Sequence, residues 1–352
     1  MARSKRRWRV LVGLLVLLAI GAVLFGRGPP QPQRATSGPM LRAVLASQSA
    51  PASSPVRGLA FGPDGGLLIA YADGSLFSRS KAGSTRRLRS GSPIASMRFS
   101  PDRRRLALGG YDGSVVLVDL DGRLLRTVAT QGPATWSLAF APSGDQLAAG
   151  SEDGRLRFFD LVSGTKRAVQ AHRLNIWSLD VDRHGHPASG SFDRRIRLWD
   201  MVTATALPVS AAHDQAIVGL AFAPDGKSLA SGGDDSTLRL WDHDLRPLWR
   251  RSAGQHLYAV SFTPDGRWIA TGGREASGLQ ALARLLFGVR LGGGNGKTVR
   301  LWRAADGAMV DAVGVQPGDV PAIAISPDGT FLASGADDGS VAIWRLENAP
   351  PR

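Results

Sequence analysis

The chain has 352 residues, of which 43% are hydrophobic and 20% charged, a balance that excludes a wholly disordered protein. It has no cysteine, which excludes disulfides, thiolate metal sites and a cysteine nucleophile. The net charge is +14, but residues 1–40 hold seven basic residues and no acidic one, so half of the surplus lies there. A nucleic-acid-binding domain usually carries its positive charge on one face of its fold, so we expect no nucleic-acid partner.

The N-terminal segment has the pattern of a membrane anchor. Residues 1–9 are basic, and residues 10–25 are an uninterrupted apolar run. The run is close to the length that a helix needs to cross a bilayer. We therefore predict that residues 10–26 form a transmembrane signal-anchor helix that binds the chain to the membrane, with residues 1–9 as a basic cytoplasmic tail. A cleaved secretory signal also begins with basic residues and an apolar run, so secretion after cleavage is the alternative.

Both interpretations place the rest of the chain outside the cytoplasm, because most of the flanking positive charge precedes the apolar run. The arginine-rich, cysteine-free composition is typical of a bacterial protein. We therefore expect a single-pass protein of the inner membrane whose folded part lies in the periplasm. Residues 27–40 are rich in proline and polar residues, which predicts a semi-extended linker that does not pack.

A repeat of about forty residues fills the remainder of the chain. Residues 221–242 read AFAPDGKSLASGGDDSTLRLWD, and residues 139–160 and 324–345 are similar. Each unit holds short apolar runs separated by Pro-Asp-Gly or Asp-Gly turns, a pattern typical of antiparallel strands joined by hairpins. One hydrophobic anchor per unit gives seven units with spacings of 38, 41, 41, 41, 40 and 63 residues, the anchors being Phe61, Phe99, Phe140, Val181, Phe222, Phe262 and Ile325.

These units resemble the WD-repeat β-propeller family over residues 41–346, with endings such as Trp199-Asp200 and Trp241-Asp242. The resemblance implies an all-β fold, a seven-bladed β-propeller of four-stranded blades, here preceded by one N-terminal transmembrane helix. It also implies a structural network of histidine, serine or threonine, aspartate and tryptophan within a blade. The residues at these positions are His172, Ser189, Asp193 and Trp199 in the fourth unit, His213, Ser231, Asp235 and Trp241 in the fifth, and Ser334, Asp338 and Trp344 in the seventh.

The ends of the repeat region and one insertion need separate interpretation. The seventh unit lacks a fourth strand, so we expect residues 41–47 to complete the last blade and close the ring, since an unpaired edge favours aggregation. Residues 347–352 are predicted to be a tail.

Residues 275–296 are an insertion in the sixth unit with an apolar stripe at helical spacing. The stripe packs on the propeller, docks a partner or rests on a membrane, and the sequence leaves these alternatives open.

Three groups of residues resemble chemical sites, and each has a simpler structural interpretation. His172, Ser189 and Asp193 match a catalytic triad, but the same trio recurs in the fifth unit, as a structural repeat does. His184 and His186 share a hairpin turn with Asp182 as the one obvious third ligand nearby, whereas a tetrahedral metal site needs more ligands. We therefore expect no enzyme activity, no catalytic residue, no metal, no cofactor and no small-molecule substrate. The arginines two residues before the blade tryptophans are interpreted as solvated blade surface; they are Arg197, Arg239 and Arg300.

The WD-repeat family binds partners mainly at the end of the ring that carries the loops leading into each innermost strand. Aromatic and arginine side chains there are typical anchors of a protein interface. We therefore predict a non-enzymatic scaffold, a membrane-tethered propeller that binds a protein or peptide partner at this end. The alternative is a propeller hydrolase or metal-dependent enzyme with its site in the central channel. The candidate partner-binding residues are Arg57, Trp136, Asn175, Trp177, His256 and Tyr258.

Overall fold

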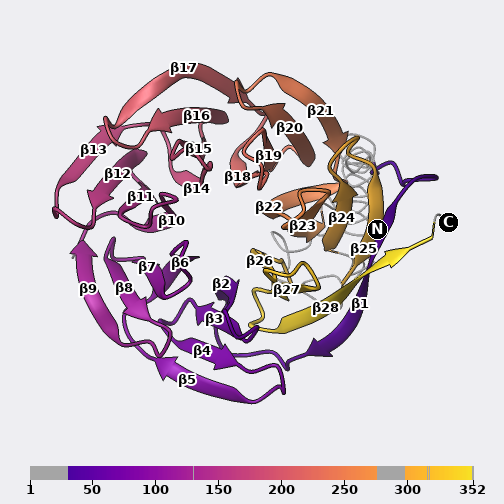
Figure 1. Ribbon diagram of the computed structural model, residues 1–352, viewed down its shortest axis with the longest axis horizontal. Helices are drawn as coiled ribbons and strands as arrows, with labels where there is room; N and C mark the ends of the chain where they lie inside the picture. The colour runs from indigo at the N-terminus through magenta and orange to yellow at the C-terminus, as the bar shows by residue number, and fades with distance from the viewer. Residues whose placement is uncertain (1–30, 130, 276–297, 315, 317, 351–352) are drawn as a thin grey trace, which may run out of the picture.

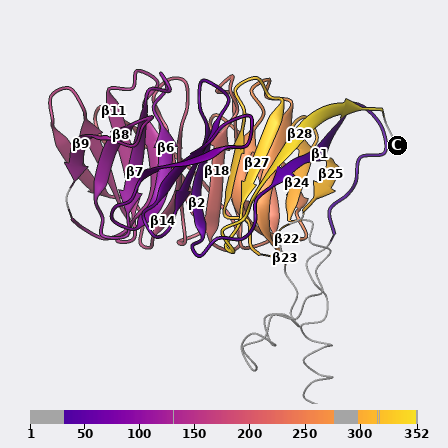
Figure 2. The same ribbon diagram turned by 90° about the horizontal axis from the view of Figure 1, so that it is seen from below.

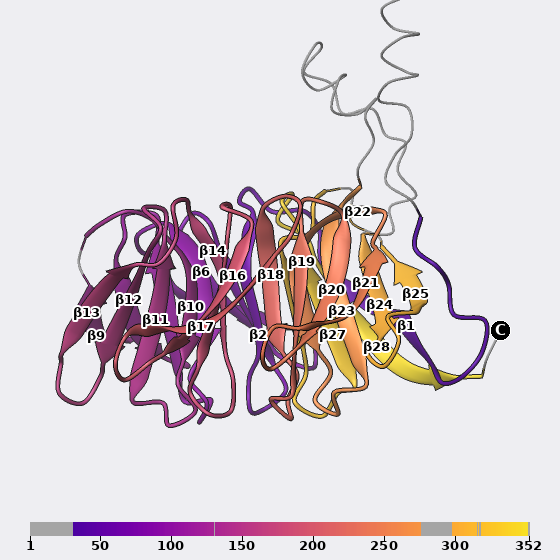
Figure 3. The ribbon, with the colours of Figure 1, turned by 90° about the horizontal axis from the view of Figure 1, so that it is seen from above.

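The computed structural model describes residues 31–350 except 130, 276–297, 315 and 317. In these residues, 28 strands form seven four-stranded antiparallel sheets, which stand as blades around a central channel (Figure 1). The blades follow one another around the ring in chain order, and the edge-on views show them as a flat disc (Figures 2 and 3). The predicted all-β, seven-bladed propeller with four-stranded blades is therefore confirmed.

Each blade consists of four strands, from the innermost at the channel to the outermost at the rim. Blade one holds β2 (Val56–Phe61), β3 (Leu67–Tyr71), β4 (Leu76–Arg79) and β5 (Thr85–Arg89); blade two holds β6 (Ile94–Phe99), β7 (Arg105–Gly110), β8 (Val115–Asp119) and β9 (Leu124–Ala129); blade three holds β10 (Thr135–Phe140), β11 (Gln146–Ser151), β12 (Arg155–Asp160) and β13 (Lys166–Gln170); blade four holds β14 (Ile176–Val181), β15 (Pro187–Ser191), β16 (Arg195–Asp200) and β17 (Thr205–Ala212). Blade five holds β18 (Ile217–Phe222), β19 (Ser228–Gly233), β20 (Thr237–Asp242) and β21 (Pro247–Ser252); blade six holds β22 (Gln255–Phe262), β23 (Trp268–Glu275), β24 (Val299–Arg303) and β25 (Met309–Val313); blade seven holds β26 (Ala322–Ile325), β27 (Phe331–Gly335), β28 (Val341–Ala349) and β1 (Met40–Gln48).

In blade five, burial decreases from the innermost strand to the outermost strand. All six residues of β18, with the sequence IVGLAF, are buried, whereas every residue of the outer strand β21 is exposed or half-buried. A short, continuous apolar run is the pattern of a strand that is covered on both faces. The inner strands therefore form the packed wall of the channel, and the outer strands meet solvent.

Adjacent blades fit closely where a glycine of one second strand faces the inner strand of the next blade. A Cβ atom on Gly150 would lie 2.5 Å from a side-chain carbon of Ile176, and one on Gly190 would lie 2.7 Å from Ile217. Both isoleucines are fully buried. A larger residue at either glycine would push the blades apart, so the fit between blades depends on these positions.

The Pro-Asp-Gly turns join the innermost strand of a blade to its second strand. In the turn after β18, the Gly226 N–H donates to the Ala223 carbonyl at 2.8 Å, and the Asp225 carboxylate accepts from the Lys227 N–H at 3.0 Å. Gly226 has a φ of +70°, a conformation that glycine adopts without strain. The turn signal in the sequence is thus also the physical cause of the hairpin.

The first strand of the chain lies in the last blade. β1 pairs antiparallel with β28, from Met40 opposite Ala349 to Gln48 opposite Ala342. Residues 41–47, which we expected to close the ring, therefore form part of the outermost strand of blade seven. The Ala43 N–H donates to the Asp311 carboxylate of β25 at 3.0 Å, which ties the closing strand to blade six as well.

The structure corrects two boundaries drawn from the sequence. The predicted tail 347–352 is in part a strand, because β28 continues to Ala349 opposite β1. The predicted linker 27–40 is also shorter, because residues 33–35 pair with β25 and Met40 already belongs to β1. Proline lacks an N–H, but the backbone carbonyls of a proline-rich segment remain good acceptors, so such a segment can still be bonded to a blade.

Two predicted features lie outside the described residues. They are the transmembrane helix 10–26 and the insertion 275–296, of which Glu275 alone is described, as the last residue of β23. In the described part of the chain, no helix has both the length and the apolar character needed to cross a bilayer.

Candidate protein-binding face and blade network

Seven residues form a ring at one end of the central channel. Each lies four residues before the hydrophobic anchor of its blade, and all of them line a cavity of about 370 Å³; they are Arg57, Ala95, Trp136, Trp177, Val218, Tyr258 and Pro321. We call this end, where the innermost strands begin, the proximal face, and the opposite end the distal face. Four of the six candidate partner-binding residues belong to this ring.

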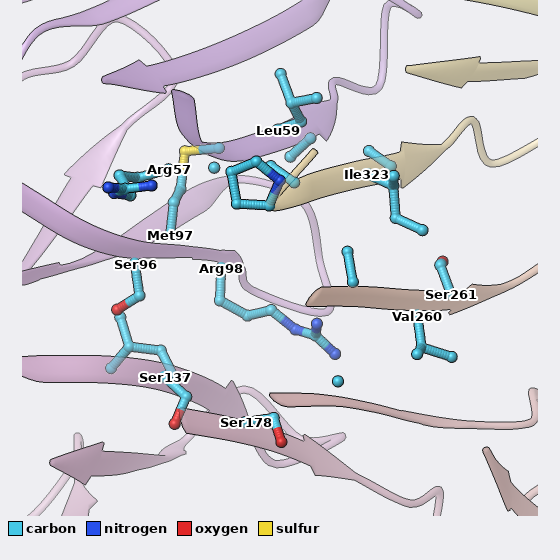
Figure 4. A pocket seen from close by; sticks show the side chains of 18 of the residues that line it. Arg57, Leu59, Ser96, Met97, Arg98, Ser137, Ser178, Val260, Ser261 and Ile323 are labelled. Carbon is cyan, nitrogen blue, oxygen red and sulfur yellow. The ribbon is translucent and has the colours of Figure 1, made fainter. Parts of the chain in front are cut away.

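The rest of the channel wall carries small hydroxyl groups, apolar side chains and two arginines, Arg98 and Arg103. Figure 4 shows Arg98 among these side chains. Arg98 extends from β6 into the channel and pairs with the Asp180 carboxylate of β14, two blades away. Asp180 also accepts a hydrogen bond of 2.7 Å from the Phe222 N–H. The channel is therefore lined by aromatic rings at its proximal end and bridged by an ion pair farther toward the distal face.

Four aromatic rings contact one another in a row across blades two to four on the proximal face. The rings of Trp136 and Trp177 are stacked with centroids 4.5 Å apart and an interplanar angle of 17°. Phe192 stacks on Trp177 at 5.4 Å, and Tyr111 meets Trp136 edge-on at 5.3 Å. All four side chains are half-buried. We call these four residues the aromatic arc, and its partly exposed rings offer a rigid apolar surface.

The indole N–H of Trp136 is buried and, among the described residues, has no hydrogen-bond acceptor. A buried donor without an acceptor costs free energy in the unbound protein. The sequence predicted Trp136 and Trp177 at this face but not the two rings that extend the stack. Tyr111 and Phe192 each follow the second strand of their blade, so they do not occupy the position four residues before an anchor on which the prediction was based.

The other half of the proximal face is polar. Arg57 pairs with Asp337 at 3.2 Å and donates to the Tyr111 hydroxyl at 2.9 Å, which links blades one, two and seven. The Arg274 guanidinium lies 5.8 Å from the centre of the Tyr258 ring. Burial, with a smaller contribution from nearby carboxylates, raises the pKa of Tyr258 to about 12. Its phenol is therefore a neutral hydrogen-bond donor at physiological pH.

The remaining two candidates lie beside the ring. His256 is half-buried, and its Nδ1 atom lies 3.6 Å from the Asp234 carboxylate. Asn175 is half-buried in the loop before β14, where its carbonyl accepts from the Phe192 N–H at 3.1 Å. The structure thus gathers all six candidates on one face, with Asn175 positioning a ring of the aromatic arc.

The network residues of blade four lie in hydrogen-bond contact with one another. His172 Nε2 lies 2.7 Å from Ser189 Oγ, which also accepts from the Trp199 indole at 2.8 Å. His172 Nδ1 lies 3.0 Å from the Asp193 carboxylate. Blade five repeats the geometry with His213, Ser231, Asp235 and Trp241 at 2.7, 2.8 and 3.0 Å. The contacts join the proximal loop of each blade to its second and third strands.

Blade seven has a glutamine in place of the histidine. Ser334 accepts from the Trp344 indole at 3.1 Å and donates to the side-chain carbonyl of Gln316 at 2.7 Å. Asp338 instead accepts from Ser340 within its own turn. Gln316 was missed by the sequence analysis, although it lies nine residues before Ile325, the same offset that separates His172 from Val181.

The interpretation of the blade arginines as solvated surface is wrong. Arg239 is 9% exposed and pairs with Asp235 at 2.8 Å, and Arg197 approaches Asp193 to 3.3 Å. Arg300 is 7% exposed. In Arg239 and Arg197 the stem of the side chain packs on the blade while the guanidinium reaches the network carboxylate, so these two residues extend the network.

The electrostatics of the network favour a neutral histidine beside an ionised aspartate. Burial lowers the pKa of His172 below its ordinary value, and the neighbouring Asp193 only partly opposes this. Burial acts to raise the pKa of Asp193, but hydrogen bonds from His172 and from backbone N–H groups outweigh it and hold the pKa well below its usual range. His213 and Asp235 show the same directions.

This geometry is unsuited to nucleophilic catalysis. The Ser189 side chain is fully buried, and its hydroxyl is already bonded to His172 and Trp199. A nucleophile must be reachable by the substrate. His184 and His186 have ring centres 6.4 Å apart on the distal face, and within residues 31–350, gaps aside, no cluster of three or more such ligands is arranged to hold a metal ion.

One solved structure and two curated proteins are similar to this chain. One solved structure with this fold is a chain from the crystal structure of a mitotic checkpoint complex, with a TM-score of 0.73 and 19% sequence identity over 86% of this chain and 94% of that one. In Arabidopsis thaliana, a Notchless protein homolog is 56% identical over 32 residues, which is 9% of this chain and 7% of that protein. Cell division cycle 20.1, a cofactor of the APC complex in the same plant, is 29% identical over 105 residues, which is 29% of this chain and 20% of that protein. The chain therefore spans only a small part of the length of either curated relative.

The family model "WD domain, G-beta repeat" matches six segments, which together cover more than half of the chain; they are residues 84–119, 122–160, 164–200, 206–242, 250–277 and 313–345. The first three strands of blade one lie outside these matches, yet this blade has the same four-stranded sheet as the others. The six matched repeats, set in a ring of seven such blades, show that the chain belongs to the WD40 repeat family.

Proposed function

We propose that this chain is a non-enzymatic, membrane-tethered scaffold that binds a protein or peptide partner at its proximal face. Membership of the WD40 repeat family supports the general role, since such propellers act mainly by binding proteins. Two of the similar proteins are described as components of assemblies, one as a cofactor of the APC complex and one as part of a mitotic checkpoint complex.

The aromatic arc is the observation that carries the choice of face. Rigid, half-buried aromatic rings lose little conformational entropy on binding and present a large apolar area, which is why they are frequent binding hot spots. The blade network does not require these rings, which supports a role in recognition.

The polar half of the same face supplies specificity. Tyr258 offers a neutral phenol, and Arg57 and Asp337 offer a charge pair that is itself partly exposed. A partner segment with apolar side chains against the arc and polar groups across the channel mouth would match both halves. Buried polar groups left without partners would penalise a wrong segment, which is how such a surface discriminates.

The membrane tether is the second part of the proposal. The apolar run at residues 10–25 and the basic residues before it support a signal anchor that leaves the propeller on the outer side of a bacterial inner membrane. Confinement to a membrane raises the effective concentration of a partner in the same compartment, so modest intrinsic affinity suffices.

Truncation of the aromatic face tests the proposed site. Trp177→Ala and Tyr258→Ala should each lower partner capture by about thirtyfold in affinity, because removal of a hot-spot side chain costs about 2 kcal/mol. The measurement is quantitative crosslinking in native membranes, followed by identification of the species whose yield depends on the proximal face.

Val202→Ala, in an exposed turn on the distal face, is the matched control and should leave capture unchanged. Thermal unfolding of all three variants shows whether they fold as the parent does. If both proximal variants fold normally and capture the partner as well as the parent, the proposed face is wrong.

A further inference from the structure

Residues 31–39 form a strap that is bonded along the outer edge of blade six. The Met309 N–H donates to the Gln33 carbonyl at 3.0 Å, and the Ala35 N–H donates to the Met309 carbonyl at 2.8 Å. These two bonds form a parallel bridge with the start of β25. Ala35 is 9% exposed and joins the apolar cluster between blades six and seven. The strap is therefore part of the folded propeller.

A second attachment holds the strap near the distal face. Arg303 donates to the Ser37 carbonyl at 2.8 Å and to the Pro39 carbonyl at 3.2 Å, and its guanidinium is fixed from the other side by Asp306 at 2.8 Å. Gly38 has a φ of +81°, and a Cβ atom there would lie 2.4 Å from the Arg303 guanidinium. The strap thus has a built position on the blade.

The strap starts on the proximal side of the ring. Gln31 and Pro32 lie against Gly254, whose added Cβ would be 3.2 and 3.0 Å from them, and Gly254 directly precedes β22 at the proximal face. Figures 2 and 3 show the indigo chain starting at the end of the disc where β22 begins and then crossing to the other end, where β1 starts. The described chain therefore begins at the proximal side of the propeller.

This placement leaves very little free chain between the propeller and the proposed anchor. The predicted anchor ends at Gly26, so residues 27–30 are the only connection to the start of the strap. Four extended residues reach at most about 14 Å. Had the whole stretch 27–40 been a free linker, its reach would be more than three times longer. The propeller would then have no fixed orientation relative to the membrane.

Resting on the membrane tether proposed above, we infer that the strap turns the proximal face toward the bilayer. The aromatic arc then opens onto a narrow space beside the membrane. The short connection limits the gap to about 14 Å at the rim of blade six, where the strap begins, and an extended segment fits such a gap whereas a small globular domain about 30 Å across does not. The partner is therefore a short segment of another protein in the same membrane. This segment lies next to the membrane surface, on the same side as the propeller.

The absence of cysteine makes this orientation measurable with single labels. Leu174→Cys lies in the proximal loop before β14 and Val202→Cys in the distal turn after β16, both exposed and both on blade four. Each full-length variant is reconstituted in vesicles of phosphatidylethanolamine and phosphatidylglycerol that carry a rhodamine headgroup acceptor. A membrane-impermeant thiol dye then labels only outward-facing propellers, and energy transfer to the lipid surface is recorded.

Transfer should be about twofold greater from position 174 than from position 202, because the six-residue strands separate the two faces by about 20 Å. Insertion of about twenty Gly/Ser residues after Gly28 adds roughly 25 Å of flexible chain and should abolish the difference. Equal transfer, greater transfer from position 202, or a difference that survives the insertion would overturn the inference while leaving the tether intact. Protein that does not stay with the vesicles would overturn the tether itself.

Discussion

The histidines of blades four and five stabilise the fold without carrying charge. His172 and His213 each join the proximal loop of a blade to a buried serine, and burial lowers the pKa of both imidazoles. In the unfolded chain they would titrate near pH 6.5. Asp193 and Asp235 have lowered pKa values in the fold and stay ionised beside them.

These shifts predict that the propeller loses stability as the solution becomes acidic. Below about pH 6.5 the unfolded chain binds protons on both histidines that the folded chain does not bind, so the free energy of unfolding falls by up to about 1.4 kcal/mol per histidine per pH unit. Below about pH 4 the two aspartates act in the same direction, because the unfolded carboxylates protonate first. Urea unfolding followed by tryptophan fluorescence at about pH 7.5, 6.5 and 5.5, which bracket the ordinary pKa of histidine, measures how steeply the free energy of unfolding changes with pH.

His172→Gln with His213→Gln is the control for that slope. Gln316 shows that a glutamine accepts the serine hydroxyl in blade seven, so the substitution keeps one bond of the network and removes the titrating group. The double variant should be less stable at pH 7.5 but flatter between pH 6.5 and 5.5. A parent slope that the double variant reproduces would show that other groups cause the acid sensitivity.

The closing strand is the element on which the integrity of the ring depends. β1 covers the edge of β28, and its residues Leu41 and Ala43 are buried between blades six and seven. One buried leucine side chain contributes about 1.5–3 kcal/mol, and the exposed edge left behind would pair with other chains. Deletion of residues 41–47 should therefore lower the unfolding temperature and promote aggregation.

Scanning calorimetry with light scattering measures both effects of the deletion. An unchanged unfolding temperature together with a monomeric sample would show that the ring is stable without this strand, and the account of closure would then be wrong.

The elements of the propeller were predictable because each carries a local signal. Apolar runs, Pro-Asp-Gly turns and a spacing of about forty residues specify strands and hairpins, and the seven units specify the ring. The strap was not predictable, since its bonds run from backbone carbonyls of Gln33, Ser37 and Pro39 to groups more than 260 residues away. Composition describes the freedom of a segment and contains no information about a distant donor.

The candidate site was predictable only in part for a similar reason. The register placed Trp136 and Trp177 on one face because both lie four residues before an anchor. Tyr111 and Phe192 complete the aromatic arc from the ends of other strands, so they are found only when the blades are assembled. The same holds for Arg98, which meets Asp180 across the channel.

The ring as a body has two unlike ends. The proximal face combines the aromatic arc with a polar half, and the strap begins beside it at Gly254. The distal face presents turns such as those at residues 182–186 and 200–204. Because the blades are closely packed, binding at one end should leave the other end largely undisturbed.

Hydrogen–deuterium exchange of the full-length protein, alone and with its crosslink-identified partner, decides between the two ends. Bound partner should slow exchange in the proximal loops at residues 131–136 and 172–177 and leave the distal turns at residues 182–186 and 200–204 unchanged. Slower exchange confined to the distal turns or to the outer strands would contradict binding at the proximal face.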